Sequence, residues 1–270
     1  MLKTLYTSRP GGYVLRLITR PGFSRKCAGV LDSRYSRVYI KRFIHKNDID
    51  MSDYVSERWR SFNDFFVRRI RPDARPVDMD PEALVSPCDC HLSAYTIDAG
   101  SRFTVKGADY TTAELLQNVP LARGYSGGLC LIFRLMPDNY HRYIYPDWGT
   151  KGGNVAIPGR LHTVRPMAQE KYRVYATNSR EYTILHTQNF DDVVFMEVGA
   201  IMVGRIRNHH GEHSFSRGEE KGFFEYGGST IIMLLKKGVA ALDMPFAGIL
   251  NSGEEIKVKV GARIGQRARA

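Results

Sequence analysis

The chain has 270 residues, 43% of them hydrophobic and 25% charged, which is enough to bury a full core as one domain without disulfides. No apolar run approaches the roughly 20 residues that a membrane-spanning helix needs, and the N-terminus carries no signal-like apolar segment. The formal net charge is +11, and residues 1–71 hold nearly all of this excess, with 16 Lys and Arg against 6 Asp and Glu. The basic segment predicts an anionic partner, either nucleic acid or an acidic membrane surface.

Residues 1–71 are predicted to be a helical, basic, membrane-facing region. Ser36 is expected to cap a helix through RVYIKRFIHK (37–46), where apolar residues recur at i, i+4. Ser61, with Asp64 three residues later, resembles a capping box. The short helix after it either packs its phenylalanines on the core or presents them to a lipid interface, and the two interpretations are compatible. These phenylalanines are Phe62, Phe65 and Phe66.

Residues 72–270 are predicted to form a β-rich catalytic core. A proline-punctuated connector (71–87) leads into it, and the segments that follow show the β-branching or alternation of strands. No βαβ rhythm and no internal repeat is present. We therefore expect an α+β fold, with a mainly antiparallel, sandwich- or barrel-like sheet core and the N-terminal helices packed against it. The strand-like segments are 129–136, 193–206, 229–235 and 255–260.

The cysteines and histidines predict no metal site. The spacing of the four cysteines, Cys27, Cys88, Cys90 and Cys130, indicates no disulfides and favours a reducing compartment. The run Cys88-Asp89-Cys90-His91 has no second ligand pair at zinc-site spacing, so buried thiols in a strand are the better interpretation. His209, His210 and His213, with Glu212, are expected to lie in a mobile, solvated hairpin loop.

The stretch FFEYGGSTIIMLL (223–235) interrupts a buried strand with two glycines and a serine. No nucleophile elbow or phosphate-binding loop fits it, and a bulge is the simplest interpretation. A second interpretation is chemical. The Ser229 hydroxyl attacks the carbonyl of Gly228, and the resulting ester eliminates across Cα–Cβ and cuts the chain. Hydrolysis then leaves a pyruvoyl group, a carbonyl electron sink of the kind that decarboxylases use.

The segment GEEKGFFEYGGSTIIMLLKKG (218–238) resembles the self-processing segment of phosphatidylserine decarboxylases, whose cleavage motif is Leu- or Gly-Gly-Ser-Thr. Further segments resemble that family in the same order along nearly the whole chain. The resemblance implies a pyruvoyl-dependent, membrane-associated enzyme that converts phosphatidylserine to phosphatidylethanolamine and carbon dioxide. These further segments are SFNDFFVRRIRPDARPVD (61–78), LVSPCDCHLSAY (84–95), FTVKGADYTTAELL (103–116), MPDNYHRYIYP (136–146), EVGAIMVGRI (197–206) and VKVGARIG (258–265).

The resemblance also implies a role for individual residues. Ser229 matches the pyruvoyl precursor and Gly228–Ser229 the scissile bond, so the products would be a β chain (1–228) and an α chain (229–270) that stay together. Asp89 matches the aspartate that assists self-cleavage. His141 matches the histidine assigned to acid–base work on the substrate, for which a side chain titrating near neutrality is well suited.

Two positions depart from the family pattern. The family commonly reads Tyr-His-Arg-x-His, and the second histidine completes an Asp–His–Ser relay, but here that position is Ile144. Cys90 likewise replaces the glycine after the motif aspartate. Isoleucine carries no proton, so another base is needed. We expect His162 to replace the missing histidine, with His186 as the second candidate.

Two other functions remain open. A pyruvoyl-dependent decarboxylase of a soluble amino acid would use the same site, but it has no need of a basic N-terminus with phenylalanines. The other is an uncleaved, non-catalytic lipid-binding homologue. No nucleic-acid-binding motif accompanies the basic segment. The expected location is the cytoplasmic face of a membrane, bound peripherally to anionic phospholipid, and a homodimer is left open.

Overall fold

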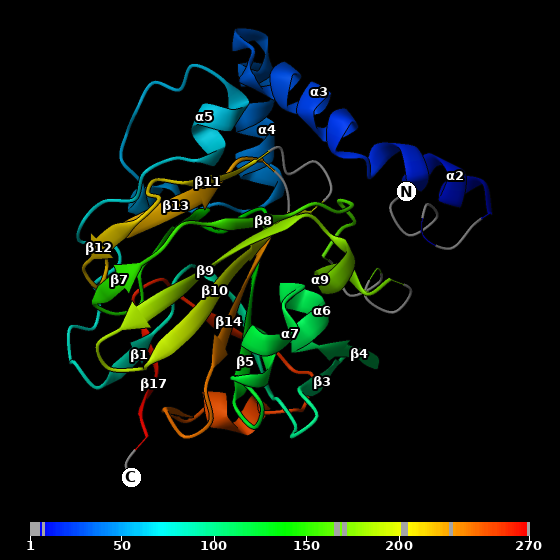
Figure 1. Cartoon of the computed structure of the whole chain (residues 1–270). Coiled ribbons are helices and arrows are strands. Elements are labelled where there is room, and N and C mark those ends of the chain that lie inside the picture. The colour runs from blue at the N-terminus through cyan, green and yellow to red at the C-terminus, as the bar shows by residue number, and fades with distance from the viewer. Residues whose placement is uncertain are drawn as a thin grey trace.

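The computed structural model describes Tyr6, residues 9–164, Ala168, and residues 172–200, 205–226 and 229–268 (Figure 1). Helices come first along the chain, as the sequence predicted. None of the helices among these residues is long and apolar enough to cross a membrane. The helices, with η for 3-10 turns, are α2 (Arg9–Ile18), α3 (Pro21–Asp32), η1 (Arg34–Arg37), α4 (Val38–Lys46), η2 (Met51–Asp53), α5 (Phe62–Phe66), α6 (Thr112–Leu116), α7 (Val119–Arg123), α9 (Val174–Thr177) and η3 (Phe246–Ile249).

The largest sheet is antiparallel throughout and runs in the order β12-β7-β9-β10-β14-β5-β2-β16, with β8 beside β9. Its path is open, so the expected α+β fold with an antiparallel core is confirmed, but no closed barrel forms among the described strands. The strands are β2 (Cys90–Thr96), β5 (Leu129–Leu135), β7 (Gly149–Lys151), β8 (Val155–Ile157), β9 (Arg180–Thr187), β10 (Asp192–Val198), β12 (His213–Phe215), β14 (Ser229–Leu235) and β16 (Ile256–Val258).

Three smaller sheets complete the fold. One has the order β11-β13-β6, another the order β1-β17-β15, and the third is the β3–β4 hairpin. Their strands are β11 (Ile206–Asn208), β13 (Glu220–Phe224) and β6 (Arg142–Ile144); β1 (Ala83–Val85), β17 (Arg263–Arg267) and β15 (Ala240–Leu242); and β3 (Arg102–Val105) and β4 (Ala108–Thr111).

The register of the largest sheet aligns one row of residues at the end where β14 begins. Ser229, the first residue of β14, pairs with Leu135, and the row follows one residue further on. Paired residues of antiparallel strands project to one face and successive residues to opposite faces, so Ser229 faces away from the row. From β16 to β9 the row reads Lys257, His91, Arg134, Thr230, Val198 and Arg180.

The sheet β11-β13-β6 covers the face to which Ser229 belongs. Tyr143 of β6 packs on Phe195 of β10, with 6.0 Å between the ring centroids. Phe195 pairs with Met233, which shares the parity of Ser229 in β14. On this face the buried ammonium of Lys221 in β13 also donates to the Glu197 carboxylate of β10 at 2.5 Å. Ser229 therefore faces an interior layer between two sheets.

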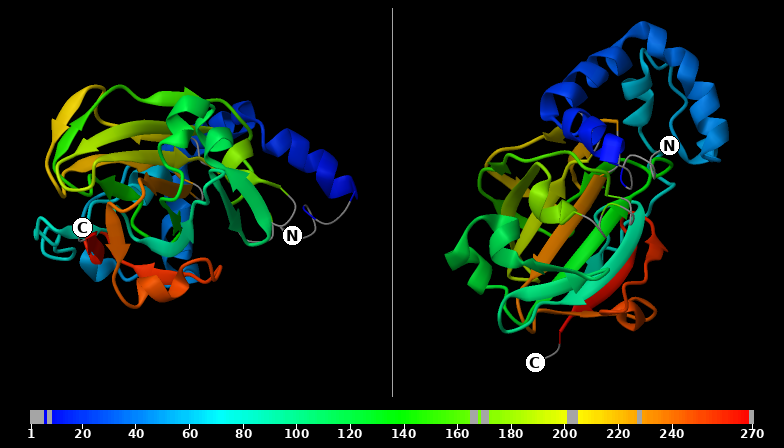
Figure 2. Two further views of the ribbon diagram at one scale, coloured as in Figure 1. Left: turned by 60° about the horizontal axis from the view of Figure 1, so that its bottom comes forward. Right: turned by 90° about the vertical axis from the view of Figure 1, so that its right-hand side faces the viewer.

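The N-terminal helices lie at the end of the molecule where β14 begins (Figures 1 and 2). An aromatic cluster joins them to the sheets: the Phe43 ring of α4 lies 5.1 Å from Phe62 and 6.1 Å from Tyr226, which precedes the Gly-Gly-Ser step. The buried members of this cluster are Ile40, Ile49, Tyr54, Phe62, Phe65, Phe66, Tyr140, Ile144 and Val260.

The expected helix caps are confirmed in one case and wrong in the other. The Ser61 hydroxyl accepts the Asp64 backbone N–H at 3.1 Å, as predicted. The helix predicted over 37–46 is present as α4, but Ser36 does not cap it, because η1 precedes α4 and the Ser36 hydroxyl instead accepts the Phe62 N–H at 2.8 Å. Because all three phenylalanines of α5 are buried, the core interpretation of this helix holds rather than the lipid-facing one.

Candidate active site

Ser229 is fully buried, and its hydroxyl has no hydrogen-bond partner among the described residues. Leaving a buried hydroxyl without a partner costs about 1–3 kcal/mol, so the fold holds this group at a cost. Neighbouring Thr230 is also buried with an unpartnered hydroxyl, but it projects to the opposite face of β14. Gly228, the other half of the predicted scissile bond, lies outside the described residues.

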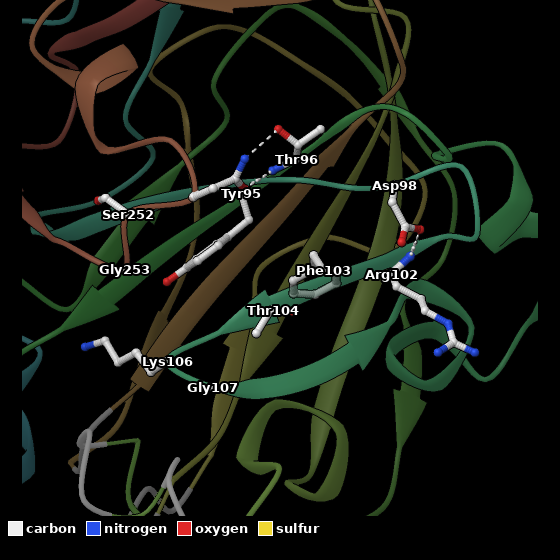
Figure 3. A pocket seen from close by; sticks show the side chains of 11 residues that line it. Tyr95, Thr96, Asp98, Arg102, Phe103, Thr104, Lys106, Gly107, Ser252 and Gly253 are labelled. Atoms are coloured by element: carbon white, nitrogen blue, oxygen red, sulfur yellow. Dashed lines mark hydrogen bonds between the residues drawn. The ribbon is translucent and has the colours of Figure 1, made fainter.

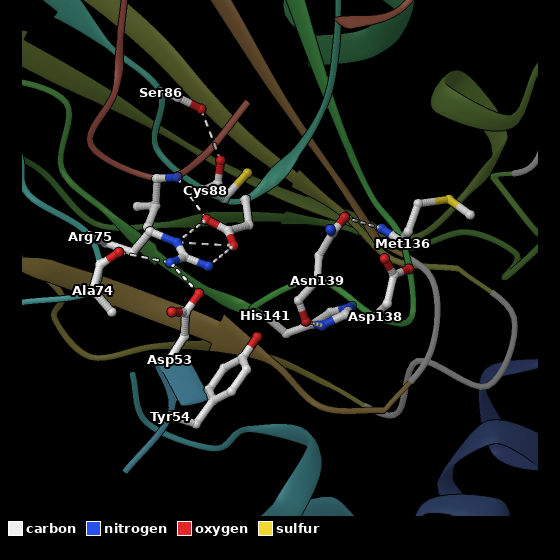
Figure 4. A network of polar contacts seen from close by, with 12 residues as sticks. Asp53, Tyr54, Ala74, Arg75, Ser86, Cys88, Met136, Asp138, Asn139 and His141 are labelled. Atoms are coloured by element: carbon white, nitrogen blue, oxygen red, sulfur yellow. Dashed lines mark hydrogen bonds and ion pairs between the residues drawn. The ribbon is translucent and has the colours of Figure 1, made fainter. Parts of the chain in front are cut away.

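Asp89 lies immediately before β2, at the same end of the sheet as Ser229 and two strand spacings, or about 10 Å, from β14. Its buried carboxylate accepts from the Arg75 guanidinium at 2.9 Å and from the Val260 backbone N–H at 2.8 Å. Arg75 also donates to Asp53 at 2.8 Å (Figure 4), and despite burial these carboxylates raise the pKa of Arg75. Asp89 is therefore held rigidly by these contacts, and the motif aspartate alone gave no sign of Arg75 as its partner.

His141 is fully buried at the entry to β6, where its carbonyl oxygen accepts the Phe224 N–H at 3.0 Å. Its ring packs on the Phe66 ring of α5, with 4.1 Å between the ring centroids. Its Nδ1 lies 2.9 Å from the Asn139 carbonyl oxygen (Figure 4) and must carry the proton, because a carbonyl only accepts. Its Nε2 has no partner among the described residues.

The charge state of His141 follows from its surroundings. Burial lowers the pKa of His141 to about 3, the nearby Arg68 guanidinium acts in the same direction, and the hydrogen bond to Asn139 opposes it only in part. The ring is therefore neutral near pH 7, with a free lone pair on Nε2. Such a nitrogen can accept a proton from a hydroxyl and return it to a carbon or oxygen.

Ile144, at the position where the family commonly has histidine, lies beside the Asp89 segment. Its backbone N–H donates to the Pro87 carbonyl oxygen at 2.9 Å. Its side chain is buried in the aromatic cluster of the N-terminal helices, together with Val260, whose N–H binds Asp89. An apolar residue at this position therefore adds to the packing of the N-terminal cluster. The Asp89 carboxylate is paired with Arg75 instead of with a histidine at position 144.

The predicted replacement base, His162, lies on the other side of Ser229 from Asp89. Asn178 donates to the carbonyl oxygens of both His162 and Gly199 at 2.8 Å, and Gly199 follows β10, a neighbour of β14. The ring is mostly buried, which lowers its pKa, and its Nδ1 lies 3.5 Å from the Tyr6 hydroxyl. From β2 to β10 is three strand spacings, about 14 Å, so Asp89 and His162 do not meet.

His186, the second candidate base, lies at the opposite end of the sheet. Arg180 of β9 belongs to the row beside Ser229, and His186 lies six residues further along the same strand. Six residues of strand span about 20 Å. Its imidazole is more than half exposed and pairs with Asp192 at 2.6 Å. His186 is therefore too far along β9 to reach Ser229.

Two hollows open at opposite ends of β2. One of about 130 Å³ reaches Asp89 and Arg75 and is also lined by Asn139, whose carbonyl oxygen binds His141. A larger hollow of about 430 Å³ lies between the β3–β4 hairpin and residues 251–253 (Figure 3). Tyr95, which lines it, has the parity of His91 in β2, so this hollow is on the face opposite to Ser229.

The cysteines follow the sequence-based prediction. All four are free, and Cys88, Cys90 and Cys130 are fully buried. Burial raises the pKa values of the Cys88 and Cys130 thiols, so they stay protonated. Within the described part of the chain, Cys88 and Cys90 join no cluster of potential metal ligands.

Comparison with known proteins identifies the family. Residues 62–266 match the model of the family described as phosphatidylserine decarboxylase. The chain belongs to this family. It is 41% identical over 266 residues to phosphatidylserine decarboxylase proenzyme 2 of Clostridium acetobutylicum, a match covering 98% of this chain and 91% of that protein. It is also 41% identical to the proenzyme of Ruminiclostridium cellulolyticum (98% and 90% covered) and 38% identical to that of Clostridium novyi (98% and 92% covered).

The pKa of His141 predicts a pH dependence of stability. The ring stays neutral in the folded protein down to about pH 3 but is protonated below about pH 6.5 once unfolded, so the folded state loses stability as the pH falls through this window. In a Ser229→Ala background, which keeps one chain, lowering the pH from about 7 to about 5 should cost the parent about 2 kcal/mol more than a His141→Gln variant, at 1.4 kcal/mol per pH unit. Urea unfolding at several pH values measures this difference. Parallel curves would contradict a buried, neutral His141.

Proposed function

We propose that this chain decarboxylates phosphatidylserine to phosphatidylethanolamine and carbon dioxide, using a pyruvoyl group that it makes from Ser229. The observation that carries the proposal is a buried serine hydroxyl at the predicted cleavage site, without a partner among the described residues, with an ion-paired Asp89 and a neutral His141 at the same sheet end. The relatives named above are phosphatidylserine decarboxylase proenzymes, which agrees with self-processing.

The cleavage step balances without an external oxidant or reductant. Ser229 Oγ loses its proton to a base and attacks the Gly228 carbonyl carbon, and the Gly228–Ser229 amide becomes an ester. Elimination breaks the Cβ–O bond and releases residues 1–228 as a carboxylate. The dehydroalanine left on residue 229 takes up water and releases ammonia. The pyruvoyl carbonyl so formed supplies an electron sink for the decarboxylation of an amine-bearing substrate.

The two products would stay together after cleavage, because three strands of the smaller one pair with strands of the larger one. In residues 229–268, β14 pairs with β5 and β10, β16 pairs with β2, and β17 pairs with β1. The seven residues of β14 are all buried. The carboxylate of Asp89 adds a contact through the Val260 N–H. Cleavage therefore removes one covalent bond and leaves the sheet in place.

The exposed face of α2, α3 and α4 suits a lipid surface. It combines large exposed apolar side chains with exposed cations, and each cation near an anionic membrane contributes about 1 kcal/mol. A groove of about 800 Å³, lined by Tyr35, Val38, Ile40, Ile44, Met51 and Trp59, opens on the same face. We propose that this surface binds anionic phospholipid at the end of the molecule where Ser229 lies. The exposed apolar residues include Tyr13, Leu17, Val30, Tyr35, Val38 and Tyr39, and the cations include Arg16, Lys26, Arg34, Arg37, Lys41 and Arg42.

Two histidines compete for the role of base in self-cleavage. His162 remains the sequence-based prediction, supported by its anchoring beside Gly199 at the start of β14. A specific observation favours His141: its ring is buried and neutral, and its Nε2 has no partner among the described residues. In the decarboxylation itself, we propose that His141 returns a proton to the substrate carbon.

Activity should depend on Ser229 and on a lipid substrate. The purified protein should release labelled carbon dioxide from carboxyl-labelled phosphatidylserine in detergent micelles, and Ser229→Ala should release none. Ser126→Ala, which removes another serine hydroxyl far from the site, should keep parental activity. Turnover of free serine at a comparable rate would favour the soluble-substrate alternative instead.

The choice of base is tested by the fragment pattern on a denaturing gel. If His162 is the base, His162→Ala accumulates as the full-length chain while His141→Ala is cut into residues 1–228 and 229–270. If His141 is the base, the two patterns exchange. His186→Ala should be cut like the parent, because that ring lies about 20 Å away along β9. Complete cleavage in both His141→Ala and His162→Ala would exclude both histidines.

Lipid binding should be lost when the exposed apolar face is charged. The double change Tyr35→Glu and Val38→Glu should reduce cosedimentation with vesicles of anionic phospholipid at least tenfold, because both side chains are more than two-thirds exposed there. Val119→Glu on α7 is the matched control, since Val119 is also exposed but lies outside this face. Equal binding by the double variant and the control would refute the proposed surface.

A further inference from the structure

His210, His213 and Glu219 form a cluster at the edge of the molecule, away from Ser229. Each offers one ligand atom, and these atoms lie within 4.8 Å of one another. His213 Nε2 and Glu219 Oε1 are 2.7 Å apart, and the rings of His210 and His213 stack with centroids 3.7 Å apart. The sequence pointed to Glu212 as the nearest acid. The chain instead turns back through β12, which brings Glu219 to the histidines.

The surrounding groups hold all three ligands in place from outside. The Tyr145 hydroxyl lies 3.4 Å from His210 Nδ1, which leaves Nε2 of that ring for another partner. The Ser216 N–H donates to Glu219 Oε2 at 2.9 Å. The Lys151 ammonium donates to the carbonyl oxygens of His210 and Gly211 at 2.9 and 2.6 Å and fixes the backbone between the two histidines. Outer contacts of this kind orient the first ligands of metal sites.

We propose that His210, His213 and Glu219 bind one Zn²⁺ ion. Two imidazoles and one carboxylate are a ligand set that zinc accepts, with water in the fourth position of a tetrahedron. Bonds of about 2.0–2.2 Å place ligand atoms about 3.4 Å apart. His213 Nε2 and Glu219 Oε1, now 2.7 Å apart, must therefore separate slightly, while the farthest pair, at most 4.8 Å apart, must move closer. On binding, the His213 proton moves through solvent from Nε2 to Nδ1, and the Nε2 lone pair binds Zn²⁺.

The proposed ion has a structural role. His210 follows β11, His213 opens β12, and Glu219 directly precedes β13. An ion bound by all three residues therefore joins the two ends of the segment that connects β11 to β13. It also fixes the start of β13, the strand that leads toward Tyr226 and Ser229. The three ligands are half-buried, so water and ions reach them from solvent.

Calorimetric titration of the tag-free, purified protein with Zn²⁺, after chelator treatment, tests the site. We expect one equivalent bound per chain, with affinity reduced at least tenfold in His213→Gln and in Glu219→Gln. His186→Gln is the matched control, because it breaks another exposed histidine–carboxylate pair, His186–Asp192, and should leave the titration unchanged. Absence of binding by the parent, or unchanged affinity in both cluster variants, would overturn the proposal.

Thermal unfolding separates a lost ligand from a damaged fold. Without metal, His210→Gln and His213→Gln should unfold at the parental temperature, and added Zn²⁺ should raise the midpoint of the parent and of His186→Gln only. An equal Zn²⁺-induced rise in His210→Gln and His213→Gln would contradict the site. Neither readout depends on decarboxylase activity, so the proposal stands or falls apart from the proposed function.

Discussion

The pairing of β14 between β5 and β10 is the constraint on which the site depends. It fixes Ser229 at the end of a central strand, opposite Leu135. It also determines which side chains of β5 and β10 project to the same face of the sheet as Ser229, because side chains alternate between faces along each strand. It also buries all seven residues of β14, so the smaller product of cleavage would be locked into the sheet. A serine at the edge of the sheet would find water as a partner, whereas this hydroxyl is buried and has no partner among the described residues.

The candidate site combines an ion-paired Asp89 with a neutral His141. Arg75 and the Val260 N–H bind the carboxylate of Asp89. Burial keeps His141 neutral, and its Nδ1–H donates to the Asn139 carbonyl oxygen. The loss of the usual relay histidine is compensated in packing, because Ile144 joins the cluster that fastens the N-terminal helices to the core. Those helices carry the exposed apolar and basic surface, so the proposed membrane contact lies at the end of the sheet where Ser229 begins β14.

The sequence was sufficient to predict the α+β class, the helices ahead of a β-rich core, the free cysteines and the family. Each of these follows from local patterns: alternation in the strands, the Ser61 cap and ordered motifs. Three features were out of reach because they depend on distant contacts. Ser36 reads as a cap but binds Phe62, 26 residues away. Arg75 as the partner of Asp89, and Glu219 beside His213, depend on how loops fold back. The distance from Asp89 to His162 depends on sheet order, which strand patterns do not give.

The chemical state of residue 229 tests the central claim most directly. Intact mass measurement of the purified protein should give two species, residues 1–228 with a free carboxylate and residues 229–270 lighter by one ammonia than a fragment that begins with serine. The smaller species should also react with a hydrazide reagent through its new carbonyl. A single full-length mass, or a fragment that begins with unmodified serine, would contradict the account.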